Sequence, residues 1–160
     1  MFVRICLIAI LLAATAAYAQ PTGAELTFTT GRAWFGGPTG TLWGGAATLP
    51  LHSRISLEGS AVTSNVRYQT VLEQNPRYRS RTLISGGVAV RAGAQRAYWF
   101  AGAGPGAFRG LEGDWTSTLT GSTGVVLAPV GRTIIRAEVF GAWKREWLVK
   151  GVKVGFGFRL

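Results

Sequence analysis

The sequence has few of the residues that enzymes and metal sites commonly use. Its 160 residues include one cysteine, one histidine and seven acidic residues. The cysteine, Cys6, lies in an apolar N-terminal segment, and the rest of the chain has no thiol for a disulfide, a nucleophile or a thiolate metal site. A long apolar run is also missing, because Ile5–Ala14 is shorter than the ~20 residues that a membrane-spanning helix needs.

The N-terminal segment has the residue order of a secretory signal peptide. Arg4 precedes the apolar run, and small residues ending in Ala17-Tyr18-Ala19 precede Gln20. The alternative is a membrane anchor, which the shortness of the run disfavours. We therefore expect residues 1–19 to be a cleavable signal peptide and residues 20–160 to form one exported domain.

Negative charge is scarce as well, since seventeen Lys and Arg face seven acids and give a formal net charge of +10. Such an excess favours nucleic acid or anionic lipid as a partner. An exported protein rarely meets nucleic acid, whereas the outer leaflet of a Gram-negative envelope is built from phosphorylated lipid. We expect outer-membrane lipid, including lipopolysaccharide, and no nucleic acid among the partners.

Glycine is abundant and helical periodicity is absent. The 23 glycines are too frequent for helix interiors, where each costs about 1 kcal/mol relative to alanine. Instead, segments of about ten residues alternate with a period of two, as a strand that crosses a bilayer does. The predicted strands are Glu25–Phe35, Thr41–Leu49, Ile55–Tyr68, Tyr78–Arg91, Ala97–Arg109, Trp115–Leu127, Thr133–Trp143 and Lys150–Leu160.

The predicted connections form two sets. Three are short, contain Pro or Gly and place an arginine before the next strand: Leu49–Arg54, Arg91–Arg96 and Leu127–Thr133. The alternate connections are more varied: Gly36–Gly40, Gln69–Arg77, Gly110–Asp114 and Lys144–Val149. Tight turns at one end and mixed loops at the other are typical of outer-membrane barrels.

The two faces of the strands differ in a way that favours lipid over water. One face of Lys150–Leu160 is apolar to the last residue, and the opposite faces of the strands hold mainly Gly, Ser, Thr and Ala with a few charges of both signs. A sheet in a bilayer must close, because lipid satisfies no backbone hydrogen bonds. We predict an all-β, eight-stranded antiparallel up-and-down transmembrane β-barrel; the alternative is a soluble exported β-sandwich or lipocalin-like barrel.

Two local features qualify that pattern. Arg32 shares a face with Leu26, Phe28 and Trp34, which suggests a bulge near Thr29-Thr30-Gly31 or an unexpected register. Aromatic residues gather near the strand ends, as an interfacial girdle requires. The expected girdle residues are Trp34, Trp43, Tyr68, Tyr78, Tyr98, Trp99, Trp115, Trp143 and Trp147.

The C-terminal residues resemble the assembly signal of outer-membrane β-barrel proteins. Lys153 stands at the polar position of that signal, Gly155 at the glycine, Phe158 at the aromatic and Leu160 at the terminal residue, which is more commonly Phe. The architecture is similar to the small OmpA-type barrels of eight strands. The resemblance implies an outer-membrane location, periplasmic termini and recognition by the barrel assembly machinery, and it leaves the activity open.

Candidate chemistry is sparse. His52 and Ser53 invite comparison with lipid A-modifying barrel enzymes, but neighbours in a strand point to opposite faces and this segment reads as a turn. Gly102–Gly106 lacks the following helix that a phosphate loop needs, so we expect a close backbone approach, with Pro105 at a bulge or near the strand end. Glu112 and Asp114 are expected to stay solvated. We predict no catalytic site, metal or cofactor.

Two sets of charged residues remain as site candidates. Charges in a narrow lumen are costly unless paired, so we predict ion pairs among Glu58, Glu138, Arg91, Arg136 and Lys153, the alternative being hydrated pockets near one end of the barrel. Arginine matches phosphate geometry, so lipid-phosphate contacts are predicted at Arg67, Arg77, Arg79 and Arg81, a merely solvated loop being the alternative.

The predicted role is structural or surface-interacting, with a monomeric barrel whose lumen is plugged by side chains. Alternatives are a narrow porin-like channel for small solutes, a lipid A-modifying enzyme, or the soluble barrel or sandwich.

Overall fold

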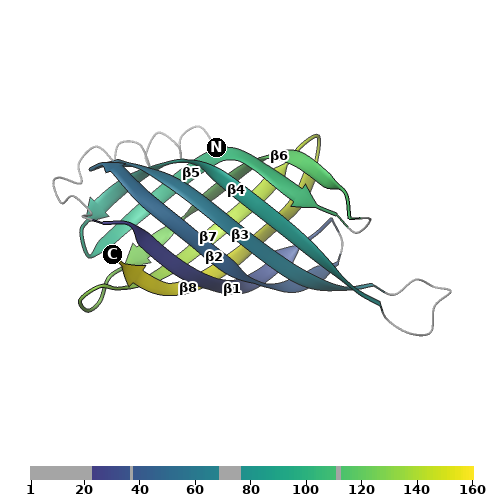
Figure 1. The fold of residues 1–160 in the computed structure, drawn as a ribbon, viewed down its shortest axis with the longest axis horizontal. Helices are drawn as coiled ribbons and strands as arrows, with labels where there is room; N and C mark the ends of the chain where they lie inside the picture. Colours follow the sequence, from purple (N-terminus) through teal and green to yellow (C-terminus); the bar gives the residue numbers. More distant parts are fainter. Residues whose placement is uncertain (1–22, 37, 69–76, 111–112) are drawn as a thin grey trace, which may run out of the picture.

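A computed structural model describes residues 23–36, 38–68, 77–110 and 113–160, so the predicted signal peptide lies outside the described residues. The described chain forms one closed antiparallel barrel of eight strands (Figure 1). No helix in this part of the chain is long and apolar enough to cross a bilayer. The strands are β1 (Glu25–Trp34), β2 (Thr39–His52), β3 (Ile55–Tyr68), β4 (Arg77–Ala94), β5 (Ala97–Arg109), β6 (Trp115–Leu127), β7 (Thr133–Trp143) and β8 (Trp147–Arg159).

Every strand pairs with its neighbours in sequence, and β1 also pairs with β8 to close the barrel. The strands are strongly inclined to the barrel axis in Figure 1. The tight turns β2–β3 and β4–β5 have only two residues each and lie at the end that also holds the C-terminus, called here the turn end. The opposite end, where β1 meets β2, β3 meets β4, β5 meets β6 and β7 meets β8, is the loop end.

The predicted all-β barrel and its eight strands are confirmed, and most differences are at strand ends. The expected bulge near Thr29-Thr30-Gly31 is wrong, because β1 pairs in unbroken register with both β2 and β8. Arg32 is simply an outward residue of a regular strand. Register shifts occur instead between Pro50 and His52 and between Ala142 and Trp143, next to connections.

The glycine-rich part of β5 shows the predicted close backbone approach without the predicted bulge. A Cβ on Gly104 would lie 2.2 Å from the carbonyl oxygen of Gly86, so only glycine fits there. The β4–β5 register continues unchanged from Ser85–Gly106 to Val88–Ala103. Pro105 stands in the middle of the strand, with an exposed ring and an interrupted ladder to β4, because proline has no N–H to donate.

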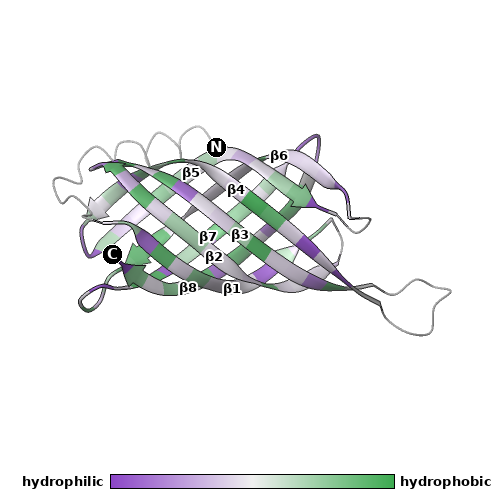
Figure 2. Cartoon of the chain, in the orientation of Figure 1, coloured by the Kyte–Doolittle hydropathy of each residue, from purple (hydrophilic) through white to green (hydrophobic). Residues whose placement is uncertain are grey.

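Residues alternate between the interior and the outer surface along each strand. Figure 2 shows apolar and polar patches alternating along the ribbons. The five apolar residues of β8 and the C-terminus all point outward, with Val154 56% exposed and Leu160 65% exposed. Large apolar side chains lie exposed on each of the eight strands except β5, whose outward positions hold mainly alanine and proline.

The interior is arranged in layers along the barrel axis. Near the turn end, Tyr98, Phe100, Val126, Ala128 and Ile134 form a small apolar cluster. The loop end holds a larger cluster, called here the loop-end cluster: Ala33, Phe35, Leu42, Val62, Val66, Leu83, Phe108, Phe140, Ala142 and Val149. Charged residues fill the space between these two clusters.

Candidate functional site

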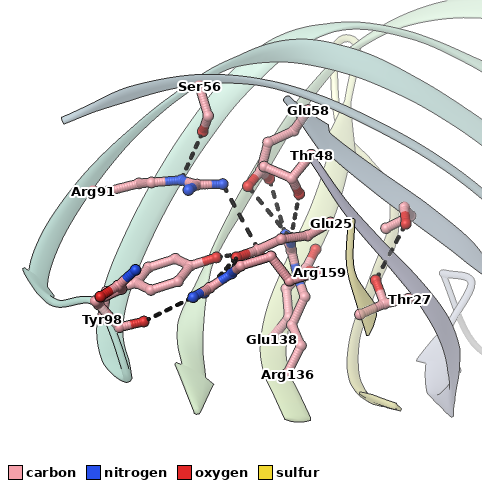
Figure 3. Close-up of polar contacts among 12 residues, drawn as sticks. Glu25, Thr27, Thr48, Ser56, Glu58, Arg91, Tyr98, Arg136, Glu138 and Arg159 are labelled. Carbon is pink, nitrogen blue, oxygen red and sulfur yellow. Dashed lines mark hydrogen bonds and ion pairs between the residues drawn. The ribbon is translucent and has the colours of Figure 1, made fainter. Parts of the chain in front are cut away.

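The central charged layer is organised around Arg136 of β7. Its Nε donates a hydrogen bond of 2.7 Å to Glu138, and its Nη2 donates one of 2.9 Å to Glu58 on β3 (Figure 3). Thr48 of β2 accepts from Nη1 at 3.2 Å, and the guanidinium carbon lies 3.9 Å from the ring centroid of Phe100. One arginine thereby joins strands on opposite sides of the barrel.

Lys153 of β8 extends the same network. Its Nζ lies 3.1 Å from Oε1 of Glu138 and 5.1 Å from the ring centroid of Phe140. The side chains of Lys153 and Glu138 are almost wholly buried. Removing water from charges is expensive, so these buried carboxylates and cations are costly to the fold unless they are paired.

A second group of charges lies nearer the turn end and centres on Glu25 of β1. Arg159 of β8 donates to Glu25 Oε1 from Nη2 at 2.8 Å and from Nε at 3.1 Å. The hydroxyl of Tyr98 donates to Glu25 Oε2, as Figure 3 shows. Glu25 and Arg159 are directly opposite each other in the ladder that closes the barrel.

The structure brings four of the five residues predicted for lumen ion pairs into one network: Glu58, Glu138, Arg136 and Lys153. Arg91 lies elsewhere. Its Nε donates to Ser56 at 3.0 Å, its Nη2 is 3.9 Å from Glu25, and its guanidinium stacks over Tyr98. Both Nη atoms of Arg91 are buried without a hydrogen-bond partner.

Sequence reasoning missed Glu25, Tyr98 and Arg159 as members of the interior. Lys153 and Arg159 are an even number of residues apart on β8 and therefore share its inward face, so the sequence pattern could have identified Arg159 as an interior residue. Tyr98 was expected in the outer aromatic girdle, and this is wrong because its side chain faces inward and is 6% exposed.

A small cavity of about 40 Å³ lies beside the Arg136 network. Glu58, Glu138 and Lys153 line it together with small residues of β4, β5 and β6. The interior is therefore asymmetric, because long side chains from β7 and β8 reach toward strands that carry glycine and serine.

The one histidine and its neighbour lie at the turn end. Ser53 Oγ and His52 Nδ1 are 3.1 Å apart and exposed, and no described acid bonds to this histidine. Within the described ranges, no group of three or more His, Cys, Asp or Glu could hold a metal ion. Asp114 is exposed, and Glu112 lies outside the described residues.

The residues of the resembled C-terminal signal lie on both faces of β8. Phe158 and Leu160 point outward, whereas Lys153 and Gly155 point inward. A Cβ on Gly155 would lie 2.8 Å from Cγ2 of Thr29, so the glycine lets β8 pack tightly beside β1.

The arginines predicted to contact lipid phosphate divide into two kinds. Arg81 faces the interior, is 8% exposed, donates from Nη1 to the Phe35 carbonyl and stacks on the Phe35 ring. Its buried guanidinium is therefore not available to lipid, which corrects the prediction. Arg79 is exposed at the loop end. The side chains of Arg67 and Arg77 lie outside the described ones.

Four tryptophans lie outward near the loop end: Trp34, Trp43, Trp115 and Trp143. Trp99 lies outward and partly exposed near the turn end. The side chains of Tyr68, Tyr78 and Trp147 are not among those described. An outward ring of tryptophan is the arrangement found where a barrel meets a membrane interface.

Comparison with known proteins finds structural but no sequence matches: no protein-family model and no curated protein matches the chain. The N-terminal β-barrel domain of Pseudomonas aeruginosa OprF superposes with a TM-score of 0.56 at 17% identity, over 88% of this chain and 100% of that one. Ail, the attachment invasion locus protein of Yersinia pestis, gives 0.56 at 14% identity over 86% and 97%. Neisserial surface protein A gives 0.57 at 12% identity over 86% and 96%.

The fold is that of a small outer-membrane β-barrel. The matches extend over nearly the whole length of each solved barrel, so the resemblance predicted from the C-terminal residues is confirmed for the architecture. At these identities the likeness concerns the fold.

Proposed function

We propose that this chain is an integral barrel of a Gram-negative outer membrane, exported through its signal peptide, with a structural or surface-interaction role. The observation that carries the proposal is that the placement of apolar and charged side chains is the reverse of that in a water-soluble protein. Carboxylates and cations lie inside, while Val152, Val154, Phe156 and Phe158 lie outside, each about half exposed. Hydrocarbon is the surrounding that makes such an outer surface favourable.

A plugged lumen is the second part of the proposal. The loop-end cluster includes Phe35 and Phe108, whose rings stack at 6.3 Å between centroids. Below it, Arg136, Glu58, Glu138 and Lys153 span the interior. An eight-stranded barrel is only wide enough for side chains, so these residues leave room for a few water molecules but not for a solute.

Two observations support a surface role: the charged residues exposed at the loop end and the similarity in fold to Ail. Ail is named for attachment and invasion and has been solved in complex with the heparin analogue sucrose octasulfate. The present chain exposes two cations, Lys144 and Arg145, and one acid, Glu146, in its β7–β8 connection. We infer that the loop end meets anionic partners outside the cell, and that the barrel acts as a monomer without catalysis.

Fractionation followed by gel electrophoresis tests the membrane assignment. The full chain is expected in the outer-membrane fraction, where unboiled and boiled samples migrate differently because the closed barrel resists detergent. A band found only in the soluble periplasm, with no shift on boiling, would refute it.

The narrow channel is the second candidate, and the cavity beside Arg136 is the observation that favours it. Recording in planar bilayers separates the two. A plugged barrel gives no discrete steps, whereas reproducible steps that change in Arg136→Met would establish the channel and overturn the plug.

A further inference from the structure

Two cations lie next to each other on the outer face near the loop end. Arg32 of β1 and Lys150 of β8 are both exposed. Arg32 pairs with Val152 and Lys150 pairs with Trp34, which makes the two cations diagonal neighbours on adjacent antiparallel strands. Such positions are ~7–8 Å apart, within reach of two long side chains.

Among the described residues, neither Arg32 nor Lys150 has an ion pair. The acidic residues of the described strands, Glu25, Glu58 and Glu138, are bonded inside the barrel, and the other described acids, Asp114 and Glu146, lie in connections at the loop end. Arg109, another outward cation near the loop end, donates its Nε to the carbonyl of Gly113 at 3.1 Å. Neighbouring like charges destabilise a sheet, so Arg32 and Lys150 favour an anion that binds between them.

Two neighbouring tryptophans indicate the depth of the Arg32–Lys150 pair in the membrane. Trp34 pairs with Lys150, and Trp43 pairs with Thr30, two residues before Arg32. Both tryptophans are exposed on the outer surface. Because exposed tryptophan marks the level of lipid head groups, the two cations lie where lipid phosphates lie.

An apolar groove of about 740 Å³ begins below the cations on the same outer face. Phe28 and Phe156 form one wall and Ile84 the other, while the floor consists of Gly45, Ala47, Gly59 and Ala61. Phe28 is four residues from Arg32 along β1, or about 13 Å at the rise of a strand. Because barrel strands are tilted by ~35–45°, the groove begins about 10 Å deeper than the cations, where the acyl chain of a lipid held by its head group would lie.

We propose that a phosphorylated lipid of the loop-side leaflet binds this face, with its phosphate between Arg32 and Lys150 and one acyl chain in the groove. The inference rests on the proposed membrane location and adds to it a defined site, different from the loop arginines. Charge favours lipid over a second copy of the chain, because a dimer through this face would bring both cation pairs together and none of the described strands carries an outward acid to offset them.

The experiment measures lipid retained by the full-length barrel. The protein is reconstituted in phosphatidylcholine vesicles that contain a few per cent of bisphosphorylated lipid A, extracted in mild detergent and examined by native mass spectrometry. Arg32→Gln with Lys150→Gln is expected to lower the retained lipid A roughly 25-fold, since each cation contributes about a fivefold attraction to anionic lipid and the two factors multiply. Arg109→Gln is the matched control and retains the wild-type amount, and wild-type protein retains little dephosphorylated lipid A.

A second pair of variants tests the groove. Gly59→Leu projects a side chain into it, and Gly121→Leu projects one from β6 outside it; a Cβ at either position has no neighbour closer than 3.8 Å. Only Gly59→Leu is expected to reduce retention, by severalfold.

Four results would overturn the proposal. The first two are unchanged lipid A retention in the double variant and an equal loss of retention in Arg109→Gln. The other two are a loss of retention in Arg54→Gln instead, which would assign the groove to lipid of the turn-side leaflet, and a dimer of the wild-type protein that Gly59→Leu dissociates. The shift on boiling is recorded for every variant. Its absence from wild-type protein would mark failure of the membrane assignment itself, which keeps the two outcomes distinct.

Discussion

The central charged layer around Arg136 and the loop-end cluster fill the interior of the same barrel by different kinds of contact. At the loop end, aromatic and aliphatic side chains such as Phe35 and Leu42 fill the interior by shape. In the middle, Arg136 bonds two carboxylates and a threonine. An apolar layer tolerates replacement by residues of similar volume, whereas a buried ionic layer fails when one partner is lost.

The comparison teaches how a barrel with a narrow interior can specify one closed arrangement. Contacts of the loop-end cluster are non-directional, so they favour compactness and specify register weakly. The contacts between Arg136 and Glu58 link β7 to β3, and those between Arg159 and Glu25 link the last strand to the first. We hypothesise that the charged residues select the register at which β8 meets β1.

Loss of Arg136 should have the largest effect. Arg136→Met leaves Glu58 and Glu138 buried with Lys153 as their remaining cation, and breaking such a network costs about 3–5 kcal/mol. Urea unfolding in phosphatidylcholine vesicles, followed by the loss of the band shift, measures the change. Arg132→Gln, in the exposed β6–β7 connection at the turn end, is the control and should change the unfolding free energy by no more than ~0.5 kcal/mol.

Truncation in the loop-end cluster should come next. Leu42 is 1% exposed, and Leu42→Ala should cost about 2–4 kcal/mol through lost burial and the cavity left behind. Leu42→Met keeps the volume and should cost less than about 1.5 kcal/mol. If both variants lose as much as Arg136→Met, the distinction between the two layers is wrong.

The closing pair provides a smaller test. Glu25→Gln keeps the shape of the side chain and removes the charge that Arg159 and Tyr98 bind, at a cost of about 2 kcal/mol. Tyr98→Phe removes only one hydrogen bond and should cost about 1 kcal/mol. Equal effects in the two variants would show that Arg159 contributes nothing to closure.

His52 supplies the smallest expected effect and a baseline for the turn end. His52→Ala removes an exposed side chain that contacts only Ser53 among the described hydrogen bonds, so stability should change by less than ~0.5 kcal/mol. Analysis of acyl chains on lipid A in cells that express each form should give identical patterns. An altered pattern would establish the lipid-modifying enzyme and remove the non-catalytic assignment.

Strand positions were predictable because side-chain alternation is a local property. Four of the predicted strands, Ile55–Tyr68, Ala97–Arg109, Trp115–Leu127 and Thr133–Trp143, have the observed bounds. β2 and β4 continue further toward the turn end than predicted, since Pro50 and Gly93 look like turn residues in sequence yet lie within strands. Turn composition alone does not show whether the neighbouring strand continues to pair.

The interior network was predictable in part. Parity along β7 and β8 identifies Arg136, Glu138 and Lys153 as inward residues, and their charges suggest pairing. The sequence did not show which acid bonds to which base, because Glu58 reaches Arg136 from the opposite side of the barrel and is 78 residues earlier in the chain. For the same reason Arg81 looked like a loop cation and Tyr98 like a girdle residue until the closed sheet showed which way each points.

The sequence by itself determined the period, number and faces of the strands, because the alternation of apolar and polar side chains is a local property of each strand and does not depend on its neighbours. Only the tertiary structure decided the partners: the ladder between Glu25 and Arg159, the reach of Arg136 to Glu58, and the groove beside Phe28 and Gly59. These contacts depend on the inclination and closure of the whole sheet, which bring distant residues together and are not encoded in any one strand.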